Sequence, residues 1–442
     1  MPQALGAGKA GRGAPFPGES HSCAFAAARP RGYRGGMGFR FVHAADLHLG
    51  SPLLGLTQKD DAVAARFAHA SRKAFEDLVT RAIEEDVAFA VIAGDVFDGD
   101  WKDNAIGLFF SRQIARLANK GVPTFFLRGN HDADSVITKS LIWPDRVFEF
   151  STRRAETHRL EELRVALHGR GFPRREVVEN YAADYPEPVP GFFNIGVLHT
   201  SCGRAGHANY APCTPADLAA RGYDYWALGH VHAHEIVSRE PWIVYPGNLQ
   251  GRSVRECGEK GAVIVDVEDG RVADVRRAIV DGARWAEVAV DAGRCEDEAA
   301  LMSAIEALVR PHAEAAEGRM LAVRVSLQGE TPLHARFAAD SDLRDKAEAA
   351  VQRCGDSVWL ERLRIATSPP VSRSGAPAGL DLAASLGASA EDRAVRAAVE
   401  ELLGSISARL PGGFAAETKD ALDLDGVLAE ARALALGRAE AG

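Results

Sequence analysis

The sequence predicts an α/β fold in which two layered sheets are flanked by helices, followed by a small α+β unit and a helical tail. Two patterns support this prediction. Short apolar, β-branched or aromatic runs alternate with helical stretches early in the chain, and strand-like runs then follow one another as far as residue 267. Alternation of this kind is typical of layered α/β proteins. The 442 residues, 46% hydrophobic and 26% charged, are enough for two or three domains.

The elements of the layered part follow in order along the chain. Strands are expected at residues 39–46, 87–94 and 122–129, with helices at 62–85 and 103–119. Five later apolar runs predict the remaining strands: RVALHG, FFNIGVLHT, DYWALGH, WIVYPG and AVIVDV, the last at 262–267.

The composition changes after about residue 268. Strands expected at 284–291, 320–327 and 358–366, separated by helices near 297–310 and 341–352, form the small α+β unit. A segment rich in Pro, Ser and Gly comes next. The tail beyond it is expected to be helical, with a second helix at 424–436 and with one apolar stripe made of Val395, Val399, Leu402, Ile406 and Leu410.

The charge and cysteine content limit the classes of function. A formal net charge of −9 excludes a globally basic surface, so binding to DNA would need a local basic lining, metal ions or a partner. The six scattered cysteines form no CxxC pair, which indicates reduced thiols and a cytoplasmic protein. No apolar stretch is long enough to span a bilayer, so no membrane association is expected. Residues 1–36, rich in Gly, Ala, Arg and Pro, are expected to be disordered, with Met37 as the true first residue.

Seven polar residues form a candidate metal-binding set. They occur in the segments HAADLHLG, AGDVFDG, LRGNHD, VLHTS and ALGHVHAH and are Asp46, His48, Asp95, Asn130, His199, His230 and His232. Nearly all follow a predicted strand, and α/β folds assemble their sites from loops at the carboxyl ends of strands. A single Gly-Asp or Gly-Asn pair would indicate only a turn, so the prediction depends on all five segments in this order.

Carboxylate, imidazole and amide ligands without thiolates suit two divalent ions, with Mn favoured and Fe, Zn or Mg as alternatives. The expected ligands are Asp46, His48 and His232 for the first ion, Asn130, His199 and His230 for the second, and Asp95 as a bridge between them. Two such ions, roughly 3.5–4 Å apart, form the hydrolytic site used on phosphate esters.

The expected chemistry is the attack of a metal-bridged hydroxide on phosphorus. His131 is expected to protonate the leaving group, with Asp132 or Asp98 orienting its ring. Arg252 and Arg255 follow the last ligands and could bind phosphate oxygens. An equally weighted alternative is that both arginines are surface charges in a turn.

The ordered motifs DLH, GDVFD, GNHD, LHT and GHVH resemble those of the calcineurin-like metallophosphoesterase superfamily over about residues 38–267. HAADLHLGSPL and GDVFDGDWKDN are most similar to bacterial DNA-repair exonucleases of the SbcD and YhaO kind. The resemblance implies an αββα sandwich, two Mn ions, a small capping domain, and the same ligand and acid roles. One position departs from it: Asp98 stands where double-strand-break nucleases of this family usually carry His, which favours the YhaO-like branch.

The resemblance and the composition together divide the chain into five parts. These are a disordered N-terminal extension (1–36), a metallophosphoesterase catalytic domain (37–267), an α+β capping domain (268–368), a linker (369–389) and a helical C-terminal region (390–442).

The leading hypothesis is a DNA exonuclease or endonuclease that acts in DNA repair. The resemblance implies that the helical tail docks on an SMC-like ATPase, although packing within the chain or in a homodimer would use the same apolar stripe. A phosphodiesterase for a small, cyclic-type nucleotide is the second enzyme hypothesis, and a scaffold with a vestigial metal site is the third. The capping domain and tail favour a polymer substrate, because a small-molecule enzyme needs no such platform.

Overall fold

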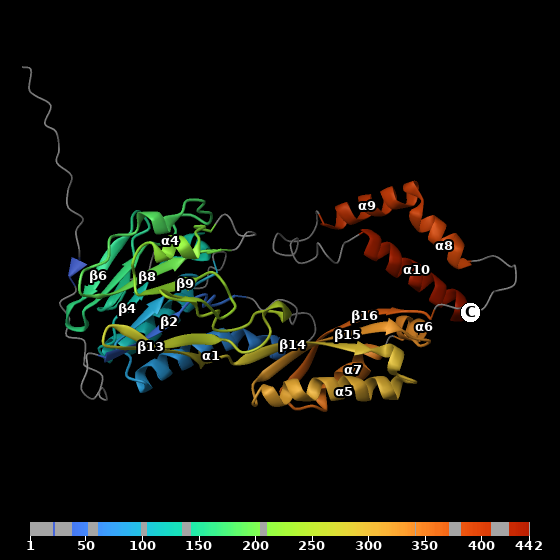
Figure 1. The fold of residues 1–442 in the computed structure, drawn as a ribbon. Helices are drawn as coiled ribbons and strands as arrows, with labels where there is room; N and C mark the ends of the chain where they lie inside the picture. The colour runs from blue at the N-terminus through green and yellow to red at the C-terminus, as the bar shows by residue number, and fades with distance from the viewer. Residues whose placement is uncertain are drawn as a thin grey trace, which may run out of the picture. The chain divides into compact units, whose positions relative to one another are not determined.

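The computed structural model describes residues 21–22, 38–51, 61–98, 104–134, 143–203, 210–340, 342–370, 382–407 and 424–441 (Figure 1). Within these residues the chain forms two compact units. The first draws on Met1–Ser51, Ala68–Gln250 and Lys260–Asp281, and the second on Pro52–Phe67, Gly251–Glu259 and Gly282–Gly442.

The first unit contains a six-stranded sheet with the order β13-β12-β2-β3-β4-β5. Its strands are β2 (Gly38–Ala44), β3 (Phe89–Ile92), β4 (Thr124–Phe126), β5 (Val147–Glu149), β12 (Gly261–Glu268) and β13 (Arg271–Ile279). β2 to β5 run parallel, and β12 pairs antiparallel with β2 and with β13. β3 and β4 are buried along their whole length, which explains why their sequences FAVI and TFF are almost continuously apolar.

A seven-stranded sheet with the order β1-β6-β7-β8-β9-β11-β10 packs against the first. Its strands are β1 (His21–Ser22), β6 (Glu156–Leu160), β7 (Val165–Gly169), β8 (Phe193–His199), β9 (Tyr225–Gly229), β10 (Glu235–Arg239) and β11 (Trp242–Tyr245). The core between the sheets is aromatic. The ring of Phe41 stacks on Phe89 at 4.9 Å and meets Tyr225 of the other sheet edge-on at 5.3 Å.

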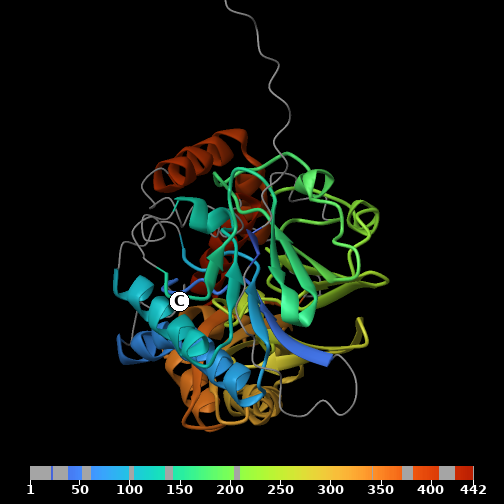
Figure 2. The same cartoon turned by 90° about the vertical axis from the view of Figure 1, so that its left-hand side faces the viewer.

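Helices cover both outer faces of this pair of sheets. α1 (Asp61–Glu84) and α2 (Asn104–Asn119) pack on the six-stranded sheet, where the rings of Phe75 and Phe110 stack at 5.4 Å (Figure 2). α4 (Pro215–Ala219) and the 3-10 helix η3 (Tyr181–Asp184) pack on the seven-stranded sheet around Trp226. The short helix α3 (Asn130–Asp134) and the 3-10 helix η2 (Glu161–Leu163) complete the unit. The αββα prediction is therefore confirmed.

The second unit is a parallel three-stranded sheet with helices on one face. Its strands are β14 (Ala283–Asp291), β15 (Met320–Glu330) and β16 (Val358–Ser368), and its helices are α5 (Glu298–Ala315), α6 (His334–Ala339) and α7 (Leu343–Gln352), with the 3-10 helices η4 (Val254–Glu256) and η5 (Ala292–Arg294). Leu301, Ile305 and Val309 of α5 are fully buried against the sheet. Their four-residue spacing places them on one face, which explains why this segment forms an amphipathic helix.

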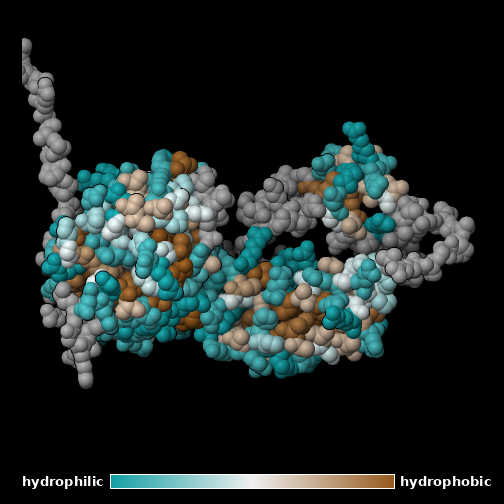
Figure 3. All heavy atoms as spheres, viewed as in Figure 1, coloured by the Kyte–Doolittle hydropathy of each residue, from teal (hydrophilic) through white to brown (hydrophobic). Residues whose placement is uncertain are grey.

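The tail forms α8 (Leu382–Glu391), α9 (Arg393–Ser407) and α10 (Leu424–Ala441). Val395 and Leu402 of α9 are 39% and 59% exposed, and Figure 3 shows hydrophobic residues on the drawn face of these helices. Of the predicted apolar stripe, Leu410 lies outside the described residues. Among the helices that the structure describes, none is both long and apolar enough to cross a membrane.

Three expected segment boundaries differ from the structure. β13 extends the six-stranded sheet to residue 279, beyond the expected boundary at 267, because Asp269 (φ 50°) and Gly270 (φ 73°) form a two-residue hairpin turn. α8 begins inside the expected linker 369–389. Residues 21–22 of the expected disordered extension form β1 beside β6, and the remainder of residues 1–36 lies outside the described residues.

Candidate metal centre

The candidate ligands lie at the carboxyl ends of strands from both sheets. The loops after β2, β3 and β4 come from the six-stranded sheet, and the loops after β8 and β9 come from the seven-stranded sheet. The first two loops are tied together, since the backbone N–H of Asp46 donates to Gly94 O (3.0 Å) and that of His48 donates to Asp95 O (3.0 Å). The segments that the sequence placed at strand ends are thus brought to one place.

Four residues in these loops have a strained backbone. Asp46 (φ 51°), His48 (φ 43°), Asp95 (φ 52°) and His230 (φ 99°) adopt the left-handed region, although none of them is glycine. Each such residue costs on the order of 1–3 kcal/mol and persists where the surrounding structure enforces it, most often at functional sites. The strain indicates that these loops are shaped to aim their side chains.

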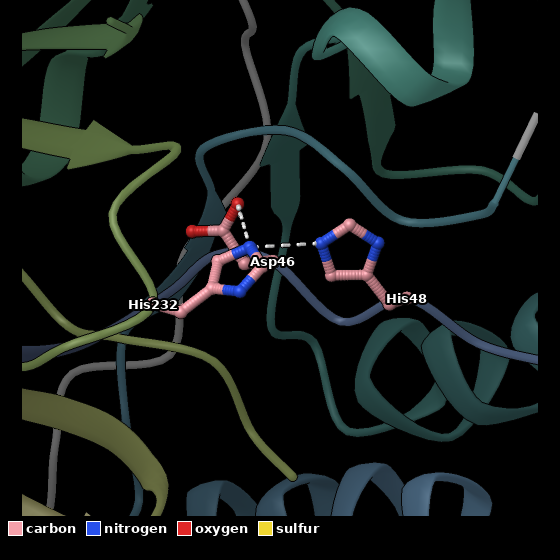
Figure 4. A group of neighbouring side chains, drawn as sticks. All are labelled: Asp46, His48 and His232. Carbon is pink, nitrogen blue, oxygen red and sulfur yellow. Dashed lines mark hydrogen bonds and ion pairs between the residues drawn. The ribbon is translucent and has the colours of Figure 1, made fainter. Parts of the chain in front are cut away.

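Asp46, His48 and His232 form the first group of converging donors (Figure 4). Nε2 of His48 lies 3.1 Å from Nε2 of His232, and that nitrogen of His232 lies 3.9 Å from Oδ1 of Asp46. Nδ1 of His48 donates to Oδ1 of Asp98 at 2.8 Å, so in the neutral ring Nε2 carries the lone pair. A lone pair facing a second imidazole nitrogen and a buried carboxylate is an arrangement that a cation would stabilise.

Asp46, Asp95 and His199 form a second group, which Asn130 joins. Nε2 of His199 lies 3.4 Å from Oδ2 of Asp95 and 2.9 Å from Oδ1 of Asn130. The backbone carbonyl of Ala93 can only accept, so Nδ1 of His199, 3.0 Å away, is the protonated nitrogen of the neutral ring. When the ring is neutral, as a metal ligand must be, the lone pair of Nε2 points toward the oxygens of Asp95 and Asn130.

His230 is placed differently from the other candidates. Its backbone N–H donates to both carboxylate oxygens of Asp46, at 3.1 and 3.0 Å. Its ring lies 5.3 Å from the ring of His199 and 4.5 Å from that of Tyr210. Tyr210 was not predicted from the sequence, because a tyrosine in a polar segment gives no signal until the fold brings it onto an imidazole.

His131 lies beside both donor groups. Its Nδ1 is 3.1 Å from Oδ1 of Asp98, and its ring centroid is 4.9 Å from that of His48. His131, His48 and Asp95 also form a third group of converging donor atoms. Of the two carboxylates expected to orient this ring, Asp98 is therefore the one that the structure places next to Nδ1.

The side chain of Asp132 binds backbone groups of two loops. Its carboxylate accepts hydrogen bonds from the backbone N–H groups of Val96 (3.1 Å), Phe97 (2.8 Å) and Gly129 (3.0 Å). Burial and the nearby charge of Asp95 raise the pKa of Asp132 to about 7, while these N–H donors act in the opposite direction. The side chain joins the loop after β3 to the loop after β4, and both loops carry candidate ligands.

Glycines allow the loops to approach this closely. A Cβ atom at Gly129 would lie 2.1 Å from Oδ1 of Asp95, and one at Gly229 would lie 2.0 Å from the carbonyl oxygen of Ala93. Gly94 (φ 95°) faces His199, whose Nδ1 would lie 2.6 Å from a Cβ atom at this position. Any larger residue at these positions would displace a candidate ligand or its support.

The electrostatics of the buried carboxylates fit a cationic occupant. Burial raises the pKa of Asp46. Burial also acts to raise the pKa of Asp95, but the neighbouring His199, His131 and His48 hold it well below its usual value. Burial acts to lower the pKa of His199, and Asp95 outweighs this and raises it to about 9. The two buried carboxylates thus favour a positively charged group beside them. Oxygen and imidazole donors without thiolates suit divalent metal ions.

The two candidate phosphate-binding arginines belong to the second unit. The backbone N–H of Arg252 donates to Oε2 of Glu256 at 2.7 Å, and its Nη2 lies 3.4 Å from Oε1 of the same residue. Arg255 lies in η4 and is exposed. The structure therefore gives Arg252 a carboxylate partner within its own turn.

Comparisons with known proteins agree with this geometry. The family described as calcineurin-like phosphoesterase matches residues 39–234, and the middle domain of the metallophosphoesterase YhaO matches residues 285–368. The chain is 33% identical to the uncharacterized metallophosphoesterase YhaO of Bacillus subtilis over 332 residues, which cover 73% of this chain and 80% of that protein. It is 27% identical to the DNA double-strand break repair protein Mre11 of Methanopyrus kandleri, over 59% of this chain and 61% of that protein.

A further similarity, at 22% identity, is to the DNA double-strand break repair protein Mre11 of Sulfurisphaera tokodaii, over 59% of this chain and 67% of that protein. The matched families cover both the unit that holds the converging donors and the sheet β14-β15-β16. Calcineurin-like phosphoesterases use divalent metal ions, in keeping with the donor groups described above. The chain belongs to the calcineurin-like metallophosphoesterases and is a metal-dependent phosphoesterase.

Proposed function

We propose that this phosphoesterase is a two-metal phosphodiesterase that cleaves DNA, as an exonuclease or endonuclease in DNA repair. The observation that carries the proposal is the convergence of two donor groups that share Asp46, next to an imidazole, His131, held by Asp98. Such an arrangement offers places for two cations and a proton donor for the leaving oxygen. Those are the two requirements of phosphodiester hydrolysis at neutral pH.

In this proposal the ligands divide as the sequence predicted. Asp46, His48 and His232 would hold the first ion, Asn130, His199 and His230 would hold the second, and Asp95 would contribute to both. Mn is favoured because the mixed carboxylate, imidazole and amide set is neither sulfur-rich nor purely oxygen-based. When bound, the two ions would lower the pKa of a coordinated water and neutralise charge on the phosphate.

His131 supplies the proton to the leaving oxygen in this proposal. A proton on Nδ1 is held by the carboxylate of Asp98, 3.1 Å away, so Nε2 is the atom from which the leaving oxygen takes its proton. The negative charge of Asp98 stabilises the protonated imidazole before the transfer. Asp132, the alternative orienting residue expected from the sequence, acts instead through the backbone that it holds in place.

The choice of DNA as the substrate is supported by the relatives. Two of the relatives described above are DNA double-strand break repair proteins. Arg252 and Arg255 remain candidates for binding phosphate oxygens, since guanidinium groups match their geometry. A cytoplasmic location belongs to the same proposal.

The tail helices are proposed to bind a partner, an SMC-like ATPase. The exposed Val395 and Leu402 of α9 provide apolar side chains for such a contact. A homodimer through the same residues is the alternative. Measurement of the mass of the purified protein by light scattering separates the two, because a dimer needs no added ATPase.

The proposal is tested with Mn²⁺, end-labelled double- and single-stranded DNA, and the purified chain. Asp95→Asn removes a buried carboxylate of the site and is expected to abolish cleavage, whereas Asp145→Asn, at an exposed position, should leave it unchanged. The ladder of products gives the polarity. Intact DNA beside hydrolysis of a cyclic nucleotide would instead support the small-nucleotide phosphodiesterase hypothesis.

A comparison of leaving groups tests the role of His131. A general acid typically contributes about 10²–10⁴-fold to the rate. His131→Ala should therefore slow DNA cleavage by at least ~100-fold but slow hydrolysis of bis(p-nitrophenyl) phosphate far less, because p-nitrophenolate leaves without a proton. Equal losses on both substrates would show that His131 is a metal ligand or a structural residue rather than the acid.

A further inference from the structure

Two cysteines lie together just beyond the strand that ends at His199. Cys202 and Cys213 are 4% and 8% exposed, and their thiols share a hydrogen bond. The backbone around them is paired, since Ser201 N donates to Tyr210 O (3.0 Å) and Gly203 N donates to Cys213 O (2.9 Å). The two segments therefore run side by side, with Cys202 between the two hydrogen bonds.

The hydrogen bonds around the pair indicate which thiol donates to the other. Thr200 has a single hydroxyl hydrogen, which it donates to the carbonyl oxygen of Ala211 at 2.7 Å. The contact of 3.4 Å between Oγ1 of Thr200 and Sγ of Cys213 is then donated by the thiol of Cys213. The sulfur of Cys213 accepts from Cys202, whose hydrogen bond lowers the pKa of Cys213, and the same bond together with burial raises the pKa of Cys202.

The other described cysteines have different surroundings. The thiols of Cys295 and Cys354 donate to the backbone oxygens of Asp291 (3.8 Å) and Glu306 (3.6 Å). Cys257 is exposed and its thiol donates to the backbone oxygen of Val254 at 2.9 Å. Contact between two thiols thus distinguishes Cys202 and Cys213 among the cysteines that the structure describes.

We propose that Cys202 and Cys213 form a redox-sensitive dithiol, which a peroxide converts reversibly into an intramolecular disulfide. Hydrogen peroxide oxidises the thiolate of Cys213 to a sulfenic acid and is itself reduced to hydroxide. The thiol of Cys202 then attacks the sulfenic sulfur, the S–S bond forms, and one water leaves. The proposal goes beyond the DNA-cleaving function and does not depend on it.

The position of the pair connects it to the metal centre. Cys202 follows His199 by three residues, and Cys213 follows Tyr210 by three. Tyr210 packs on the ring of His230 at 4.5 Å. A disulfide would therefore fix the segment that carries Tyr210 against the segment that leads from His199, which makes the centre responsive to oxidants.

The test uses the full chain with Cys257→Ser, so that the exposed thiol cannot form links between molecules. The protein is treated with hydrogen peroxide in the presence of a chelator, alkylated, and digested with trypsin. Cleavage after Arg175, Arg204 and Arg221 places Cys202 in peptide 176–204 and Cys213 in peptide 205–221. A disulfide therefore appears as a linked pair of these two peptides in the mass spectrum.

The linked pair is expected after peroxide treatment and should disappear on reduction with dithiothreitol. Cys213→Ser should abolish it, whereas Cys295→Ser, at another buried cysteine, should not. Two results would overturn the proposal. One is full alkylation of both thiols after peroxide treatment and denaturation, and the other is oxidation of Cys213 to a sulfinic acid with no linked pair. Both are measured on protein with its native pair, so neither depends on how well the variants fold.

Discussion

The Oδ1 atom of Asp98 lies 3.1 Å from Nδ1 of His131. The same oxygen is 2.8 Å from Nδ1 of His48, so one carboxylate contacts both the proposed acid and a proposed ligand. Its side chain is 18% exposed, which leaves this carboxylate less buried than those of Asp46 and Asp95. Asp98 is therefore placed to set the tautomer of His48 and the orientation of the rings of both His48 and His131.

Asp98→Asn should weaken the site without destroying it. The amide keeps the shape of the side chain but loses the charge that stabilises both rings, and partners of this kind typically contribute about 10–100-fold to metal affinity or activity. Metal affinity and the pH profile of the rate should both change, the latter because His131 loses its anionic neighbour. Asp145→Asn, at an exposed position, is the control, and unchanged affinity and profile in Asp98→Asn would refute the positioning role.

Gly129→Ala should disrupt metal binding. The new methyl carbon would lie 2.1 Å from Oδ1 and 2.6 Å from the backbone nitrogen of Asp95, so the carboxylate or the loop must move. Titration with Mn²⁺ followed by calorimetry measures the loss. Gly270→Ala is the control: its left-handed backbone costs about 1 kcal/mol of stability, but its methyl meets no described atom within 4 Å. Normal Mn²⁺ affinity in Gly129→Ala would contradict the geometry.

Removal of metal should lower the thermal stability of the protein. Without a cation, the buried carboxylates of Asp46 and Asp95 have histidines as their ion-pair partners. A metal at 100 times its Kd adds about 2.7 kcal/mol to the free energy of unfolding. Melting temperatures in chelator and in Mn²⁺ should therefore differ by several degrees, and Asp95→Asn should reduce the difference. Identical melting curves for the wild-type protein would argue against a site of this kind.

His168 should make the fold less stable as the pH falls. Its ring lies between Oγ1 of Thr157 (2.9 Å) and Oδ1 of Asn194 (3.1 Å), and burial lowers its pKa to about 4. The unfolded chain binds a proton on this residue below about pH 6.5, whereas the native state does not. Stability on the order of 3 kcal/mol is therefore present above about pH 6.5 and is lost progressively as the pH falls toward about 4.

Urea denaturation at a series of pH values measures this loss. His168→Gln should flatten the dependence between about pH 6.5 and 4, while His312→Gln, on an exposed face of α5, should leave it unchanged. His43, whose pKa burial lowers to about 3, contributes in the same direction and remains in both variants. A wild-type slope retained in His168→Gln would show that the ring is protonated in the native state.

The sequence predicted the sandwich and the approach of the candidate ligands because both depend on local signals. Short apolar runs such as those of β3 and β4 are buried on both faces, and the polar residues follow them directly. The strand ends of a layered fold lie together, so the ligand segments meet even though Asp46 and His232 are far apart in the chain. The sequence left open whether Asp98 or Asp132 orients the ring of His131. Only the contact between Asp98 and His131 in the structure favours Asp98.

Other features of the structure were not predicted from the sequence. The contact of the Tyr210 ring with the His230 ring and the left-handed backbone of Asp46 and His48 arise from tertiary constraints. The turn at Asp269 and Gly270 is a readable hairpin signal, but no strand was expected at residues 271–279, which the expected boundary at 267 placed in the capping domain. His168 is fully buried with a hydrogen-bond partner at each ring nitrogen, and only these partners in the fold reveal that it is structural.

The division of the candidate ligands between two sheets has a consequence for the order of assembly. Asp46, Asp95 and Asn130 follow strands of one sheet, whereas His199 and His232 follow strands of the other. Neither sheet alone presents all of these candidate donors, so a nascent chain that has made only β2 to β5 should capture metal weakly. Loading must wait until the sheets have docked, and the identity of the bound ion is then decided by the finished protein and the metals available to it.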